Sequence, residues 1–184
     1  MDTPLTAPGA AAPLEPDTKD WTWVLDRPCP ECGYDAASVD RGRLGALVRD
    51  NAAAWAVVLA DPAATERPDP GTWSPAEYAC HVRDVDRLFA ERLDLMLTQD
   101  DPTFPNWDQD ATALEERYDL QDPAVVREEL LAAAETVAAA YDAVPAGAWE
   151  RRGLRDNGSE FTVDTFGRYH LHDLVHHLWD VRAG

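Results

Sequence analysis

The last stretch of the chain, residues 161–181, constrains the fold most, because it combines one apolar helical face with a dense cluster of histidines. The apolar residues recur at the spacing of a helix: Leu171, Leu174, Val175, Leu178 and Val181. Four of the five histidines fall within eight residues of this stretch: His170, His172, His176 and His177. The fifth, His81, lies far upstream. Histidines gathered on one helix with a partner on another are typical of a metal site inside a helical bundle.

Three further stretches have helical periodicity, and they predict helices over residues 39–59, 75–97 and 123–144. The second has a clear start, because Ser74 and Glu77 form a capping box around a proline at the first helical position. Thr162 is expected to cap the last helix. We find no convincing strand pattern and no internal repeat. The sequence therefore predicts an all-α up-down four-helix bundle with long connections.

Composition limits the class of protein. The 184 residues suit one domain, 45% of them are apolar, and the formal net charge is −19. Nucleic acid and anionic membranes would repel such a chain, and no apolar run is long enough to span a bilayer. Three cysteines make no disulfide framework, which favours a reducing, cytoplasmic location.

The chain divides into three parts by composition. Residues 1–16 are rich in alanine and proline without the features of a secretory signal, and they predict a disordered tail. Residues 17–38 carry two tryptophans and a Cys-x-x-Cys motif between prolines, and they predict an extended arm packed on the domain. Residues 39–184 form the bundle domain.

The helical spacing also suggests which residues hold a metal. Asp173 and His177 are one turn apart at the edge of the apolar face, so both can point at one ion. His172 and His176 are also one turn apart but point further from the core, and they remain the alternative pair. His81, on the inner face of its helix, is the natural third ligand. Two imidazoles and a carboxylate suit zinc, iron, nickel or manganese, and leave a position open for water or substrate. The simpler alternative is that these histidines are solvated, hydrogen-bonded or serve the helix dipole.

The cysteines leave several interpretations open. Cys29 and Cys32, followed by Gly33, resemble one knuckle of a zinc ribbon, but no second cysteine pair exists. They are packing residues, a redox pair, or half of a metal site completed by other residues or by a second subunit. Cys80 adjoins His81 but points away from it, as a small buried side chain does.

Two segments resemble the DinB-like superfamily. Residues 73–84 contain Trp73-Ser74, then Glu77, then His81, which is similar to the signature of the family's second helix. Residues 173–181, with a His-His pair ending at His177, resemble its terminal-helix motif. The resemblance covers residues 39–181.

This resemblance implies a four-helix bundle, often a homodimer, with a histidine-rich site for a divalent metal. The resemblance implies that His81 and His177 occupy two of the family's metal-ligand positions. Asp173 stands where many relatives have histidine, although the mycothiol-dependent maleylpyruvate isomerase branch has a glutamate there. In that branch an aspartate three residues after the last ligand resembles Asp180. Aspartate is shorter than either residue, so His172 or His176 remains an alternative ligand.

The resemblance also implies a chemistry. Members of the superfamily include transferases and isomerases that use a low-molecular-weight thiol such as mycothiol or bacillithiol. We therefore expect a divalent metal, zinc above nickel, iron or manganese, which presents the thiolate to an electrophilic substrate. The alternative is a non-enzymatic, stress-related metal-binding or interaction module, its metal site closed by a fourth protein ligand such as His170.

Overall fold

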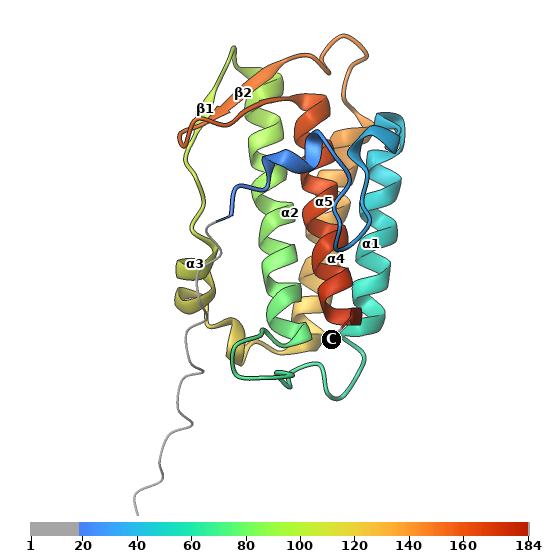
Figure 1. Cartoon of the computed structure of the whole chain (residues 1–184), viewed down its shortest axis with the longest axis vertical. Coiled ribbons are helices and arrows are strands. Elements are labelled where there is room, and N and C mark those ends of the chain that lie inside the picture. Colours follow the sequence, from blue (N-terminus) through green and yellow to red (C-terminus); the bar gives the residue numbers. More distant parts are fainter. Residues whose placement is uncertain (1–18, 184) are drawn as a thin grey trace, which may run out of the picture.

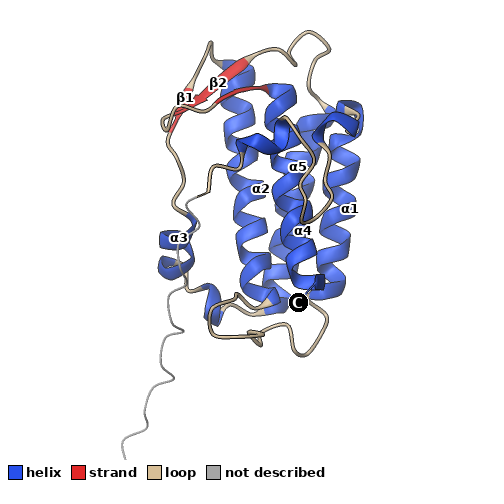
Figure 2. Ribbon diagram, viewed as in Figure 1, coloured by secondary structure: helices blue, strands red, loops and turns tan. Residues whose placement is uncertain are grey.

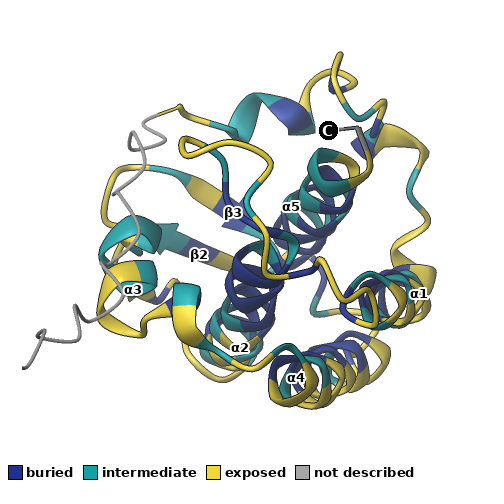
Figure 3. Cartoon of the chain, turned by 90° about the horizontal axis from the view of Figure 1, so that it is seen from below, coloured by how far each residue is buried: buried dark blue, intermediate teal, exposed yellow. Residues whose placement is uncertain are grey.

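The computed structural model describes residues 19–183. Four long helices dominate it: α1 (Leu44–Val58), α2 (Pro75–Thr98), α4 (Pro123–Asp142) and α5 (Val163–Ala183). α4 and α5 each pack against both α1 and α2, so the four helices surround one apolar core. Figure 3 shows the buried faces of the helices turned toward this shared centre. The predicted all-α four-helix bundle is confirmed.

The connection between α2 and α4 runs back along the length of the bundle (Figure 1). It contains the short helix α3 (Gln109–Glu115) and a 3-10 helix, η4 (Tyr118–Leu120). Because of this return, α2 and α4 point the same way, while α1 and α5 point the opposite way. Adjacent α2 and α5 are therefore antiparallel, and the start of α2 faces the second half of α5.

The helix starts follow from local hydrogen bonds. The Ser74 side chain accepts from the amide of Glu77, and the Glu77 carboxylate accepts from the amide of Ser74, which is the predicted capping box. The Thr162 hydroxyl accepts from the amide of Thr165 at the start of α5. α1 begins later than predicted, because a 3-10 turn, η3 (Arg41–Arg43), precedes it.

A small sheet at one end of the bundle is absent from the sequence prediction (Figure 2). Its strands are β1 (Thr103–Phe104), β2 (Arg152–Arg155) and β3 (Glu160–Thr162). β2 lies in the middle, parallel to β1 and antiparallel to β3. Strands this short carry too few residues for an alternating pattern to be recognised.

The N-terminal arm, residues 19–38 of the described part, lies across α5 (Figure 1). It is less extended than predicted, because it contains two short 3-10 helices, η1 (Thr22–Leu25) and η2 (Ala36–Ser38). The hydroxyl of Tyr34 donates to the carbonyl of Arg168, and the Arg168 guanidinium donates to the carbonyl of Ala36. These bonds tie the arm to α5.

The predicted tail of residues 1–16 lies outside the described residues. Among the helices of residues 19–183, none has the length and apolar character needed to cross a membrane.

Candidate metal centre

The antiparallel packing of α2 on α5 brings His81, Asp173 and His177 together. One nitrogen or oxygen from each side chain lies within 4.8 Å of the others. The Asp173 carboxylate is 3.5 Å from Nε2 of His81 and 3.7 Å from Nε2 of His177. The two imidazole rings meet edge to face, with centroids 4.6 Å apart. We call these three residues the candidate centre; metal binding by them stays a prediction.

Three atoms of the candidate centre are buried without a hydrogen-bond partner: Nδ1 of His81, and the facing atoms Nε2 of His81 and Oδ1 of Asp173. The 3.5 Å contact between Nε2 of His81 and Oδ1 of Asp173 does not have the geometry of a hydrogen bond. A buried polar atom without a partner costs about 1–3 kcal/mol, so native structures seldom leave two of them facing each other. A divalent cation between them would satisfy both, and imidazole nitrogen and carboxylate oxygen are ligands that such a cation accepts. The residues present thus fit a metal ion.

The protonation states suit the same role. Burial lowers the pKa of His81, which is fully buried, so its imidazole is neutral and has a lone pair to offer. Burial alone would raise the pKa of Asp173, but the neighbouring His177 and His81 hold it below its usual range. Asp173 is therefore an anion at neutral pH.

Neighbouring side chains fix the orientation of both imidazoles. Nδ1 of His177 is 3.0 Å from a carboxylate oxygen of Asp180, which leaves Nε2 to face Asp173. Metal-binding histidines almost always carry such a partner on the second nitrogen; His177 has one, whereas Nδ1 of His81 has none. The ring of His81 stacks on Trp107 at a centroid distance of 5.3 Å, and Trp73 packs on it at 5.6 Å. Trp107 also lines the adjoining cavity.

Asp173 and His177 of the candidate centre line a cavity of about 740 Å³, a size that suits a small molecule, whereas His81 is fully buried and is not part of the lining. Its lining includes five aromatic residues from the arm, α2, α5 and two connecting loops: Trp21, Trp73, Tyr78, Trp107 and Tyr169. It also includes six carboxylates: Asp20, Glu31, Asp108, Asp110, Asp173 and Asp180. Only two cationic side chains in the described residues face it, Lys19 and Arg155. This acidic lining disfavours ligands with several negative charges.

The remaining histidines of α5 lie elsewhere. His172 and His176 border the same cavity but face Cys29 and Cys32 of the arm rather than His81. His170 is fully buried, with Nδ1 3.1 Å from the Tyr141 hydroxyl and Nε2 3.0 Å from Asp86. The structure therefore does not bring His170 to the candidate centre as a closing ligand.

Sequence reasoning did not foresee that the arm helps to form the cavity. Trp21 was expected to be packed, but nothing local indicated that it would lie against His172 and His176. The only sequence signal for a contact between the arm and α5 was the presence of two closely spaced cysteines in the arm and two closely spaced histidines on α5. Trp179, near the end of α5, is 37% exposed and does not line the cavity.

Comparison with known proteins agrees with this fold. The structure is similar to that of YfiT from Bacillus subtilis, described as a probable metal-dependent hydrolase with an unusual four-helix bundle topology. The TM-score is 0.67 and the sequence identity 17%, over 79% of this chain and 89% of that one. No curated protein matches the sequence. The family model described as DinB superfamily matches residues 44–181 and so includes all three residues of the candidate centre. The chain belongs to the DinB superfamily.

Proposed function

We propose that this protein is a metal-dependent enzyme that transfers a low-molecular-weight thiol, of the mycothiol type, to an electrophilic small molecule. The observation that carries the proposal is the pair of unpartnered, buried ligand atoms of His81 and Asp173, which face each other beside His177. Three protein ligands leave at least one coordination position open, which is the arrangement of a catalytic rather than a structural site. The adjoining cavity supports access by a small molecule.

The metal would be held by Nε2 of His81, Nε2 of His177 and the Asp173 carboxylate. A divalent ion bound there lowers the pKa of a coordinated thiol, so that the thiolate predominates at neutral pH. In the transfer, the thiol loses its proton to solvent and its sulfur forms a bond to the electrophilic carbon. The leaving group departs with the electron pair of the bond that breaks.

The protein side chains bind and orient the two substrates. Trp73 and Trp107 pack against the His81 ring and so restrict its orientation. Asp180 keeps His177 in one tautomer. The aromatic surfaces favour an electrophile with an apolar or aromatic body. The acidic lining favours a thiol that is neutral or cationic over one with several negative charges.

Hydrolysis is the second candidate, because a water molecule could occupy the open position in place of the thiol. The likeness to a protein described as a probable metal-dependent hydrolase supports it. The two activities differ in one requirement: hydrolysis needs no added thiol.

The test measures zinc content and turnover together. Wild-type protein, His81→Ala and His177→Ala are loaded with zinc, dialysed and assayed with mycothiol or bacillithiol and a chromogenic alkylating electrophile. We expect both variants to lose one equivalent of zinc and at least about 100-fold of the transfer rate. Cys80→Ser is the matched control, because Cys80 is buried on the same helix and contacts Gln121 instead of the candidate centre.

The possible outcomes separate the candidates. Turnover of model esters or amides without thiol, lost in the same variants, would replace transfer by hydrolysis. Zinc binding with neither activity would instead favour the non-enzymatic module. Unchanged zinc content in His81→Ala and His177→Ala would contradict the candidate centre itself.

A further inference from the structure

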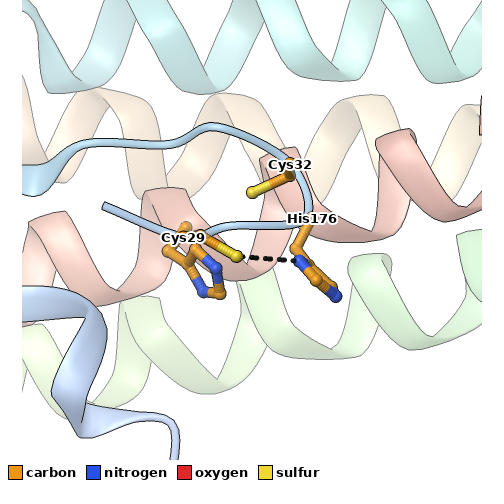
Figure 4. A group of neighbouring side chains, drawn as sticks. Cys29, Cys32 and His176 are labelled. Carbon is orange, nitrogen blue, oxygen red and sulfur yellow. Dashed lines mark hydrogen bonds between the residues drawn. The ribbon is translucent and has the colours of Figure 1, made fainter. Parts of the chain in front are cut away.

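A second group of side chains that could hold a metal ion lies beside the candidate centre, where the N-terminal arm packs on α5. We propose that a structural zinc ion fastens the N-terminal arm to α5 through four side chains: Cys29, Cys32, His172 and His176. One ligand atom from each lies within 4.8 Å of the other three. Figure 4 shows Cys29, Cys32 and His176 converging where the arm crosses α5. We call these four residues the cysteine–histidine group.

The separations fit one tetrahedral ion. With zinc–sulfur bonds of about 2.3 Å and zinc–nitrogen bonds of about 2.0 Å, two ligand atoms should stand about 3.3–3.8 Å apart. Sγ of Cys29 and Nδ1 of His176 are 3.8 Å apart, and the whole group lies within the 4.8 Å limit. Binding would thus require only small side-chain movements.

The arm is folded to present both sulfurs to α5. The amide of Gly33 donates to the carbonyl of Cys29, and the amide of Cys29 donates to the carbonyl of Tyr34. Gly33 has a φ of +74°, a left-handed conformation in which glycine carries no steric penalty, and it reverses the chain directly after Cys32. The result is a closed knuckle, which the Tyr34 hydroxyl fastens to the carbonyl of Arg168 one turn before His172.

The two histidines are prepared for the same ion. They are one helical turn apart, so both rings leave α5 on one side. Nε2 of His172 is buried without a hydrogen-bond partner, an arrangement that a bound cation would resolve. Nε2 of His176 lies 3.4 Å from Glu31 and 3.7 Å from Asp180, which leaves Nδ1 directed at Cys29. This is the carboxylate–histidine–metal arrangement of known zinc sites.

Asp180 connects the two groups. One of its carboxylate oxygens faces Nε2 of His176, and the other accepts from Nδ1 of His177. A single carboxylate therefore orients one histidine of each site, although the ligand sets share no residue. The proposal for the second ion does not require the proposed activity, because its four ligands are different side chains from those of the candidate centre.

Four protein ligands leave no open position, so this ion would be structural. Trp21 packs on both histidines, at 5.6 and 4.9 Å, and Tyr34 packs edge-on against His172. The ion would hold Trp21 and Glu31 in the wall of the cavity, and in this way it would shape the entrance to the candidate centre.

A redox role for the two thiols is less well supported. Reactive Cys-x-x-Cys pairs stand at helix N-termini, where the thiolate is stabilised. Within the described residues, no helix begins at Cys29 or Cys32. Both cysteines are free thiols in the structure.

The experiment uses cobalt(II) as a probe, because thiolate ligands give an intense sulfur-to-cobalt charge-transfer band that a histidine–carboxylate site lacks. Reduced full-length protein is stripped of metal, its thiols are counted, and it is titrated with cobalt(II). We expect two equivalents to bind and the band to appear. The Cys29→Ser/Cys32→Ser double variant should bind one equivalent without the band, whereas His81→Ala should bind one equivalent and keep the band.

Two further variants test whether the loss of the band comes from misfolding or from a wrong choice of ligand residues. Cys80→Ser should keep two equivalents and the full band, because its thiol lies outside the group. His176→Cys exchanges one ligand for another, so it should keep the ion and strengthen the band. X-ray absorption of His81→Ala with one zinc bound should find two sulfur neighbours at about 2.3 Å and two nitrogens at about 2.0 Å. Absence of the band in reduced wild-type protein, or its persistence in the double serine variant, would overturn the proposal.

Discussion

At the scale of single residues, Glu77 shows how one side chain can stabilise both a helix end and a loop. Its carboxylate accepts from the amide of Ser74 and pairs with the guanidinium of Arg67, and it is 3% exposed. Burial by itself would raise the pKa of Glu77, but Arg67 and Ser74 together hold it below the ordinary value of 4.5. The folded protein therefore binds fewer protons at Glu77 than the unfolded chain does in mild acid.

The sign of the pH dependence follows. Glu77 contributes stability that is fully present above pH 4.5 and is lost as the pH falls through its lower folded pKa. Glu77→Gln should cost about 2 kcal/mol at pH 7, because hydrogen bonds to the charged carboxylate are lost. The substitution should also make the free energy of unfolding fall less steeply as the pH is lowered. Urea unfolding of metal-free protein, followed by circular dichroism between pH 3 and 7, measures both effects.

Glu135→Gln is the matched control for this substitution. Glu135 also pairs with an arginine, Arg49, but at the solvent-exposed surface, where water screens the pair. Its replacement should change the stability far less. Equal losses in the two variants would show that burial of Glu77 is not the cause.

At the scale of elements, the close approach of α1 and α4 depends on Gly45. A Cβ at this position would lie 2.7 Å from the backbone carbonyl of Ala138 and 2.3 Å from the Asp142 carboxylate. Alanine would gain about 1 kcal/mol of helix propensity, while overpacking costs about 1–3 kcal/mol. Because a backbone atom cannot rotate away, we expect the steric term to dominate.

Gly45→Ala should therefore lower the free energy of unfolding by roughly 1–2 kcal/mol in thermal or urea denaturation. Gly147→Ala serves as the control, since Gly147 is exposed in a turn and an added Cβ meets no atom within 4 Å. Stabilisation by Gly45→Ala would mean that α1 and α4 can separate at little cost.

The helices also show which elements the sequence could predict. Capping by Ser74, Asp122 and Thr162 depends on atoms within three residues, so the starts of α2, α4 and α5 were predicted correctly. The small sheet was missed, because β1 pairs with β2 some fifty positions away and because the β2–β3 hairpin has strands of only a few residues. Helical spacing favoured Asp173 and His177 over His172 and His176 as partners of His81, and the structure brings them together.

What the sequence could not supply was the position of the arm. Cys29 and Cys32 were considered as half a site, and His172 and His176 as alternative ligands, but spacing along the chain does not show that the two pairs meet. Their meeting depends on the path of the arm over α5, which follows from long-range contacts such as those of Tyr34 and Arg168.

At the scale of the whole molecule, the bundle and the arm should respond differently to metal removal. The core consists mainly of side chains from α1, α2, α4 and α5, and the arm adds only Cys29, Tyr34 and Ala36 to the buried cluster of the described residues. The arm has few backbone hydrogen bonds, those of the knuckle between Cys29 and Tyr34 among them. A chelator should therefore release the arm while the bundle stays folded.

Hydrogen exchange can resolve this difference, because it reports opening segment by segment. If free zinc stands at about 100 times its dissociation constant, binding stabilises the closed arm by about 2.7 kcal/mol, which corresponds to about 100-fold slower exchange. Chelation should thus accelerate exchange of the Cys29 and Gly33 amides by about that factor, with α1 and α4, which carry no proposed ligand, unchanged. The Cys29→Ser/Cys32→Ser variant should exchange at the fast rate with or without zinc. Equal acceleration in the arm and in α4 would instead show that the metal stabilises the whole fold, and no acceleration would show that the arm is held without it.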